Sequence, residues 1–254
     1  MYVLFNDFGI GSLYANQLEL SLRAVDNHRP VVTLMSDAPA FRIRAAAILL
    51  RSLYRVIPQG AVVLAVVDPG VGTSRGILAI EHSGGWLLAP DNGLAAIAAR
   101  EFKGLTPWRL DMRQFPDASA SFHGRDVFVP AALMLARGAG VPGSRIYVEE
   151  LLGWRGPSEM AEVIYVDPFG NLFSGVRAAC FAGSGKVSLT IAGREIPFVR
   201  TFGDVDPGEP LLYENSLGLL ELAVNQGSAA EMFGLTVGDP LGGCPRIESL
   251  LRKS

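Results

Sequence analysis

The segment Ala61–Val67 constrains the fold more than any other part of this sequence, because all seven of its residues are apolar. The run is far shorter than the roughly 18 apolar residues that a membrane-spanning helix needs. A short strand that is apolar on both faces is typical of a parallel sheet covered on both sides. The sequence therefore predicts a buried strand inside a layered α/β domain.

Strand and helix signals alternate through the first two thirds of the chain. Short apolar runs predict strands at residues 2–5, 31–34, 77–80 and 86–89. Apolar residues at helical spacing predict helices at 13–25, 42–53, 93–102 and 127–137. This rhythm favours an α/β domain with a mostly parallel central sheet.

The pattern changes near residues 153–157, where Gly and Pro cluster. Short strand-like runs follow at 163–166, 187–191, 196–199 and 211–213, separated by turn residues. We leave the structure of 218–224 open and expect little helix beyond the boundary. The sequence predicts an N-terminal α/β domain at residues 1–153 and a smaller, all-β C-terminal domain at residues 160–254.

Composition excludes several classes of protein. A net charge of −3 provides no basic field for nucleic acid or an anionic membrane. Two cysteines, Cys180 and Cys244, rule out a disulfide scaffold, and no Cys-x-x-Cys motif is present for zinc. The histidines, His28, His82 and His123, are too dispersed in sequence to predict a metal cluster. The N-terminus lacks the basic start of a signal peptide, so we expect a cytoplasmic enzyme without a metal.

Polar and glycine-rich segments follow three of the predicted strands, at 6–11, 68–76 and 89–93. A fourth such segment, 121–126, precedes an apolar helix. Ligands of open α/β sheets bind beyond the carboxyl ends of the strands. These segments are therefore the expected site, although each polar residue taken alone also has an ordinary interpretation as a turn, cap or solvated residue.

Two of these segments resemble common nucleotide-binding motifs only in part. Residues 9–11 lack the third glycine and the acidic partner of a dinucleotide-binding turn, and 70–76 lack the Gly-Lys-Ser/Thr ending of a phosphate loop. No glycine-rich loop of the methyltransferase kind is complete. We therefore reject all three interpretations.

A combination of motifs is more specific than any of them singly. It consists of Asp7-Phe8-Gly9, residues 68–72 with Arg75, residues 122–126, Phe169-Gly170-Asn171, and the run at 215–230. In order and spacing this combination resembles the S-adenosylmethionine (SAM) hydroxide adenosyltransferases, water-using relatives of the fluorinase and chlorinase. The resemblance spans nearly the whole chain. It implies a barrel-like C-terminal domain and a homotrimer that binds SAM at its subunit interfaces.

Discriminating positions within this superfamily favour water over halide as the nucleophile. The halogenating relatives carry tyrosine where this chain has Asp68, and serine where it has Gly124. The hydrolases use an Asp-Arg-His set, which Asp68, Arg75 and His123 match. The implied reaction is attack of water on the ribose C5′ of SAM, giving adenosine and L-methionine, with SAM as substrate and no cofactor.

The three residue types suit this chemistry. The sulfonium leaves as neutral methionine, so the leaving group needs no acid. A guanidinium at Arg75 favours the deprotonated form of a nearby water, and His123 can accept or relay its proton. Asp68 can hold Arg75 through charge-assisted hydrogen bonds. The sequence does not decide which of the three takes the proton.

The resemblance also implies two groups of SAM-binding residues. The group around the ribose comprises Asp7, Phe8, Ser12 and Phe41. The group around the methionine and adenine parts comprises Asp167 and Ser216 for methionine, Asn171 for the adenine edge, Phe169 and Phe202 for the faces of the base, and Gln226 in the C-terminal motif.

Two departures from the family pattern keep alternatives open. Ser12 stands where the family usually has an aspartate that helps hold the ribose diol, which predicts weaker affinity for SAM. Ser36-Asp37 replaces a His-Glu pair found in many of the hydrolases. A non-catalytic SAM- or nucleoside-binding protein is one alternative, and a 5′-halogenase using chloride is another. A purely structural oligomer would require the aligned polar loops to be accidental.

Overall fold

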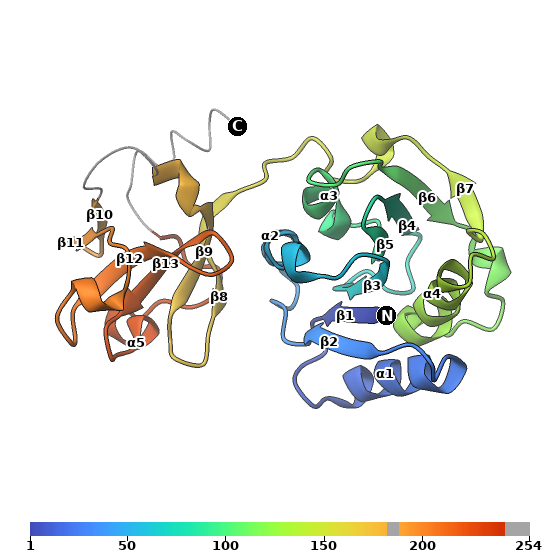
Figure 1. The fold of residues 1–254 in the computed structure, drawn as a ribbon, viewed down its shortest axis with the longest axis horizontal. Coiled ribbons are helices and arrows are strands. Elements are labelled where there is room, and N and C mark those ends of the chain that lie inside the picture. Colours follow the sequence, from blue (N-terminus) through green and yellow to red (C-terminus); the bar gives the residue numbers. More distant parts are fainter. Residues whose placement is uncertain (182–187, 242–254) are drawn as a thin grey trace. The chain divides into compact units, whose positions relative to one another are not determined.

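The described residues fold as two units that divide between Gly156 and Pro157, coloured blue to yellow and yellow to red in Figure 1. The computed structural model describes residues 1–181 and 188–241 of the 254-residue chain. Cys244 lies outside the described residues. In the part of the chain that is described, no helix is long and apolar enough to cross a membrane.

A seven-stranded sheet in the order β2-β1-β3-β5-β4-β6-β7 forms the centre of the N-terminal unit. Its strands are β1 (Tyr2–Asn6), β2 (Val31–Met35), β3 (Ala61–Val66), β4 (Ile77–His82), β5 (Gly85–Pro90), β6 (Thr106–Leu110) and β7 (Gly143–Arg145). Every residue of β3 is buried, and the strand lies between β1 and β5. The buried strand predicted for the apolar run at 61–67 is therefore confirmed.

The sheet is mixed, which corrects the expectation of a mostly parallel one. β1, β2, β3 and β5 pair in parallel, whereas β4, β6 and β7 join by antiparallel pairing. Only Ser83 and Gly84 connect β4 to β5, and a link that short allows only a hairpin. The α/β fold class itself is confirmed.

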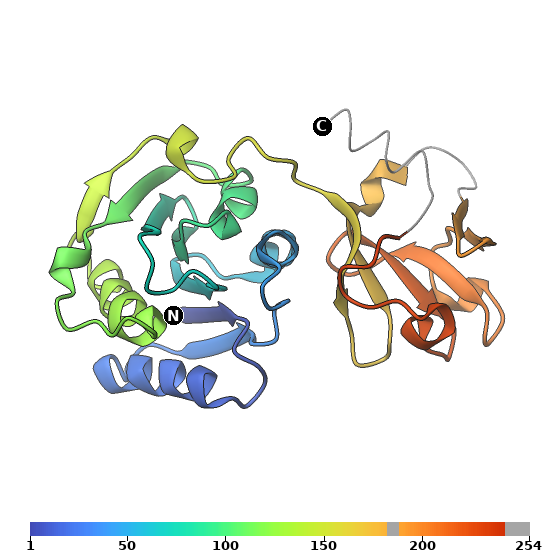
Figure 2. The same ribbon diagram turned by 180° about the vertical axis from the view of Figure 1, so that it is seen from behind.

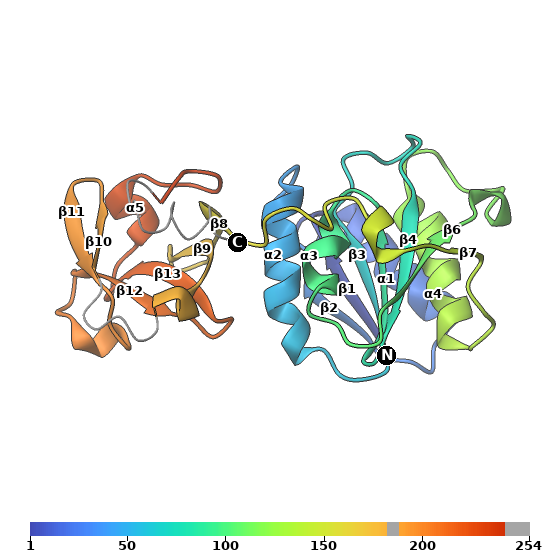
Figure 3. The ribbon, with the colours of Figure 1, turned by 90° about the horizontal axis from the view of Figure 1, so that it is seen from above.

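Helices cover both faces of this sheet, as Figure 3 shows, with α1 and α4 on one side and α2 and α3 on the other. The longer helices are α1 (Leu13–Val25), α2 (Ile43–Leu53), α3 (Leu94–Ala99) and α4 (Val129–Ala136), with short 3-10 turns at Tyr54–Val56, Met112–Gln114 and Val148–Glu150. Leu18 and Leu22 of α1 pack into the same core as Leu4 and Leu64 of the sheet. The helix predicted at 127–137 begins earlier, with a π-helical turn, η3 (Gly124–Phe128).

The C-terminal unit contains a four-stranded antiparallel sheet in the order β12-β13-β9-β8 and a separate hairpin of β10 and β11. Figure 2 shows this sheet with the short helix α5 (Ala229–Phe233) beside it. The strands are β8 (Met160–Val166), β9 (Leu172–Arg177), β10 (Ser188–Ile191), β11 (Arg194–Pro197), β12 (Pro210–Glu214) and β13 (Leu219–Val224), with 3-10 turns at Ala178–Phe181 and Phe202–Asp204.

The predicted strands of this unit correspond to β8, β10, β11 and β12, although residue 187 lies outside the described part. β9 was missed, and the segment left open at 218–224 is strand β13. Leu172, Leu212 and Leu222 meet in a common apolar core. Among the described residues the strands form two sheets joined by the bridge between Phe198 and Leu212, rather than one closed barrel.

Candidate active site

Two carboxylates meet where β1 and β3 end. Backbone pairing aligns Asn6 of β1 with Val66 of β3, so the loops carrying Asp7 and Asp68 leave the sheet at the same edge. Burial raises the pKa of Asp7, and the negative charge of Asp68 raises it further. The turn is held by Asn6, whose Oδ1 accepts the backbone N–H of Phe8 at 3.1 Å. Asp7 and Asp68 are therefore close enough for the charge of one to affect the pKa of the other.

Asp68, Arg75 and His123 form a continuous chain of hydrogen bonds. Arg75 donates from Nε to Asp68 Oδ1 at 2.8 Å and from Nη2 to Asp68 Oδ2. The same Nη2 lies 3.0 Å from His123 Nδ1, 48 residues further along the chain. The Arg75 and Asp68 side chains are 9% and 5% exposed. A two-pronged, charge-assisted pair of this kind fixes the plane of the guanidinium.

This arrangement also determines where His123 carries its proton. A guanidinium has no acceptor, so Nδ1 of His123 must accept from Arg75, and a neutral ring then carries hydrogen on Nε2. Burial lowers the pKa of His123, and the positive charge of Arg75 lowers it further. The imidazole is accordingly neutral near pH 7, with its Nε2–H left to orient a nearby oxygen.

The π-helical turn η3 begins directly after His123, and such turns are frequent at functional sites. Before it, Phe122 contacts the rings of Phe8 and Tyr14, with centroid distances of 5.8 and 5.2 Å. A Cβ atom added at Gly124 would lie 3.3 Å from the Phe122 ring and 3.7 Å from that of Phe8. A serine at position 124, as in the halogenating relatives, would press on this aromatic cluster.

Ser12 and Phe41, two of the residues predicted to bind the ribose, both lie in the N-terminal unit but differ in their local structure. Ser12 caps α1, its Oγ accepting the backbone N–H of Ala15 at 3.2 Å, which leaves the hydroxyl hydrogen available to donate. Phe41 is 81% exposed, with a left-handed φ of 62°. A phenylalanine held in that conformation costs energy, and such residues cluster at ligand sites.

A second cluster of predicted residues lies in the C-terminal unit. Asp167, Phe169, Asn171, Phe202 and Gln226 line one cavity of about 650 Å³. Ser216 is exposed in the turn after β12 and is not among the lining residues. The structure thus brings five of the six predicted C-terminal residues together.

Asp167 organises the loop at the mouth of this cavity. Its Oδ1 accepts the backbone N–H groups of Phe169 and Asn171, each at 2.9 Å, and its Oδ2 accepts Asn171 Nδ2 at 2.9 Å. This side-chain bond uses one of the two Nδ2 hydrogens, and it leaves the amide oxygen and the second hydrogen for a ligand. Tyr213 also lines the cavity and was missed from sequence, where a tyrosine on a predicted strand carries no site signal.

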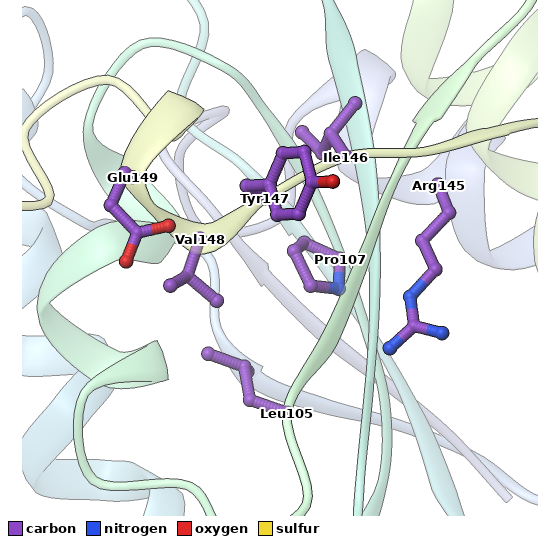
Figure 4. A pocket seen from close by; sticks show the side chains of 7 residues that line it. All are labelled: Leu105, Pro107, Arg145, Ile146, Tyr147, Val148 and Glu149. Atoms are coloured by element: carbon purple, nitrogen blue, oxygen red, sulfur yellow. The ribbon is translucent and has the colours of Figure 1, made fainter.

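The N-terminal unit also has a hollow that contains none of the predicted site residues. A hollow of about 440 Å³ near β6 and β7 is drawn in Figure 4, with the side chains that line it: Leu105, Pro107, Arg145, Ile146, Tyr147, Val148 and Glu149. The predicted site residues lie elsewhere. Within the described ranges, no group of three or more His, Cys, Asp or Glu side chains could hold a metal ion.

Comparisons with known proteins identify both units. Residues 2–144 match the SAM hydroxide adenosyltransferase N-terminal domain, and residues 161–242 match the C-terminal domain of that family. A protein of Thermus thermophilus named (R)-S-adenosyl-L-methionine hydrolase is 38% identical, with 93% of this chain and 96% of that protein covered. A Salinispora tropica protein of the same name is 36% identical, with coverages of 92% and 94%.

Structural and more distant comparisons agree with these matches. The crystal structure of a conserved Thermotoga maritima protein has a TM-score of 0.81 at 30% identity, covering 94% of this chain and 98% of that one. A fluorinase from Actinopolyspora mzabensis is only 23% identical, over 82% of this chain and 85% of its own length. The similarity is thus greater to the hydrolases than to this halogenase.

Proposed function

The chain belongs to the SAM hydroxide adenosyltransferase family, and on that premise we propose that it hydrolyses SAM to adenosine and L-methionine. The observation that carries this proposal is the hydrogen-bonded chain of Asp68, Arg75 and His123. The glycine at position 124 also supports water rather than halide as the nucleophile, because the halogenating relatives have serine there. The Phe122 ring leaves little room for a side chain at that position.

In the proposed reaction a water oxygen attacks C5′ of the ribose while the C5′–S bond breaks. The bonding electron pair stays on sulfur, which leaves as the neutral thioether of methionine. As the new C–O bond forms, the oxygen becomes strongly acidic and releases one proton to solvent. The positive charge of Arg75 favours the deprotonated oxygen, and the Nε2–H of His123 orients it in line with the C5′–S bond.

SAM itself would be held by the two groups of predicted binding residues. Asp7 presents two carboxylate oxygens suited to the ribose diol, and Ser12 and Phe41 would complete this group. The exposed ring of Phe169 and that of Phe202 would take the adenine faces, and the Asn171 oxygen would accept from its amino group. No cofactor is required, because the sulfonium is already activated.

We also propose a homotrimer with SAM at its subunit interfaces, and action in the cytoplasm, where SAM is made. Exposed apolar side chains beside the Asp7 loop support an interface there, since Ile10 and Leu13 are 81% and 69% exposed. Light scattering on the purified protein tests the assembly.

Incubation of the purified protein with SAM in ¹⁸O-labelled water tests the reaction. We expect methionine together with adenosine carrying the label at its 5′ oxygen. Because the relatives are named for (R)-SAM, both sulfonium epimers should be supplied, and the (R) form should be consumed. Bound but intact SAM would favour a binding protein, and 5′-chloro-5′-deoxyadenosine formed in high chloride would favour a halogenase; either result contradicts the proposal.

Variants of Ser12 distinguish its role as the cap of helix α1 from its proposed contact with the ribose of SAM. Aspartate and serine cap helices about equally well, whereas alanine costs about 1 kcal/mol. We expect Ser12→Asp to keep the thermal stability of the protein and to lower KM for SAM by roughly threefold to tenfold, as a hydrogen bond from the diol to a charged group would. Ser12→Ala should lower both stability and affinity. A KM unchanged in Ser12→Asp would contradict a ribose contact at this position.

A further inference from the structure

Glu221 is a carboxylic acid buried in the middle of a strand. It lies on β13 and is 1% exposed. Its neighbours Leu220 and Leu222 belong to the apolar core of the unit, so Glu221 points to the opposite face of the sheet. Cross-strand pairing places it opposite Tyr213 of β12 and Phe173 of β9. Burying a charged group costs energy unless it is well paired, so the hydrogen-bond partners of Glu221 determine what its burial costs.

Both oxygens of Glu221 accept hydrogen bonds, one from a residue that lines the C-terminal cavity and one from the turn after β12. Tyr213 donates its hydroxyl to Oε1, and Asn215 Nδ2 donates to Oε2 at 2.8 Å. Asn215 in turn accepts the backbone N–H groups of Leu217 and Leu219 at 2.9 and 3.0 Å. Glu221 therefore connects the ring of Tyr213 to the turn that carries Ser216.

The Tyr213 ring is part of the cavity wall. It contacts Phe202 with a centroid distance of 5.1 Å, and both rings line the cavity together with Asp167. Burial raises the pKa of Glu221, and Asp167 adds to this rise, while the bonds from Tyr213 and Asn215 oppose it. Glu221 is therefore bonded to a residue of the cavity lining without being part of that lining.

We propose that Glu221 is a positioning residue for SAM binding, which holds Tyr213 with Phe202 on one side and the Ser216 turn on the other. This inference rests on the proposed function of the same cavity. It requires no contact between Glu221 and the substrate. Its effect should appear in affinity and not in the rate of the chemical step.

Three variants test this role through KM and kcat for SAM and through the Kd for adenosine, measured by calorimetry. Glu221→Leu removes both hydrogen bonds and should raise KM and Kd about tenfold or more, with kcat at saturating SAM changed by less than about threefold. Glu221→Gln can keep both bonds, because its oxygen can accept from Asn215 while its amide donates to the Tyr213 hydroxyl. It should restore near-normal KM. Tyr213→Phe loses one bond and should be intermediate.

Several outcomes would overturn the inference. Normal KM and Kd in Glu221→Leu, a fall in kcat alone, or Glu221→Gln behaving like Glu221→Leu would each exclude positioning by hydrogen bonds. If Glu221→Leu does not fold, the comparison of Tyr213→Phe with Glu221→Gln decides, and equal affinities in the two reject the inference. A wild-type protein that binds adenosine without hydrolysing SAM would refute the proposed function alone, because the adenosine Kd still measures the effect of Glu221.

Discussion

Replacement of Arg75 by methionine is expected to reduce kcat for SAM hydrolysis by about a thousandfold, with SAM affinity retained. Methionine approximates the length of the side chain but removes the charge beside the attacking water and the donor that fixes His123. Losses of about 10²–10³ follow removal of one electrostatic stabiliser, and misplacing His123 adds to that loss. Release of adenosine from saturating SAM, followed by chromatography, gives kcat, and calorimetry with SAM gives the affinity.

The stability of this variant must be measured alongside its activity. Breaking a buried pair leaves one charge unpaired and costs about 3–5 kcal/mol, and Asp68 is 5% exposed on its side chain. The double replacement Asp68→Asn with Arg75→Met removes that charge, so it should recover much of the lost melting temperature but none of the activity. Arg113→Met is the matched control, since the Arg113 side chain is 89% exposed. Near-normal kcat in the stable double variant would reject the assignment of Arg75.

The fold was predictable where apolar residues were continuous or recurred at a regular spacing. The apolar run at 61–67 identified a buried strand, and helical spacing identified α1 with its observed bounds. β6 was missed because Pro107 interrupts it, and a proline inside a run argues against a strand with partners on both sides. The segment of β13 was left open, and Glu221 stands inside its otherwise apolar run. The hydrogen bonds from Tyr213 and Asn215 offset the cost of burying that carboxyl group.

The candidate site was predictable only through the combined motifs. Arg75 follows Asp68 by seven residues in a loop, and nothing in that spacing requires the two side chains to meet. His123 is 48 residues from Arg75 in the sequence, and only the folded chain brings the two side chains into contact. The sequence also does not show that Arg75 donates to Nδ1 of His123. The direction of this bond determines that Nε2 carries the proton of the neutral ring.

That direction leads to a pH prediction for His123. The proposed reaction uses the neutral ring, because protonation at Nδ1 would break the bond from Arg75. Burial and the charge of Arg75 lower its pKa from the usual 6.5, so the ring is neutral above that value and becomes protonated only at lower pH. We therefore expect kcat/KM to fall as pH decreases, with its midpoint below 6.5.

Replacement of His123 by asparagine tests both parts of this argument. The asparagine oxygen can still accept from Arg75 in the place of Nδ1, but the Nε2–H donor is lost, so kcat should fall by about 10²–10³. The decline assigned to His123 should also disappear from the pH profile. His28→Asn, at an exposed position, should leave both rate and profile unchanged. A profile that keeps the same midpoint in His123→Asn would assign the titration to another group, with Asp7 the first to test because its pKa is raised by burial and by Asp68.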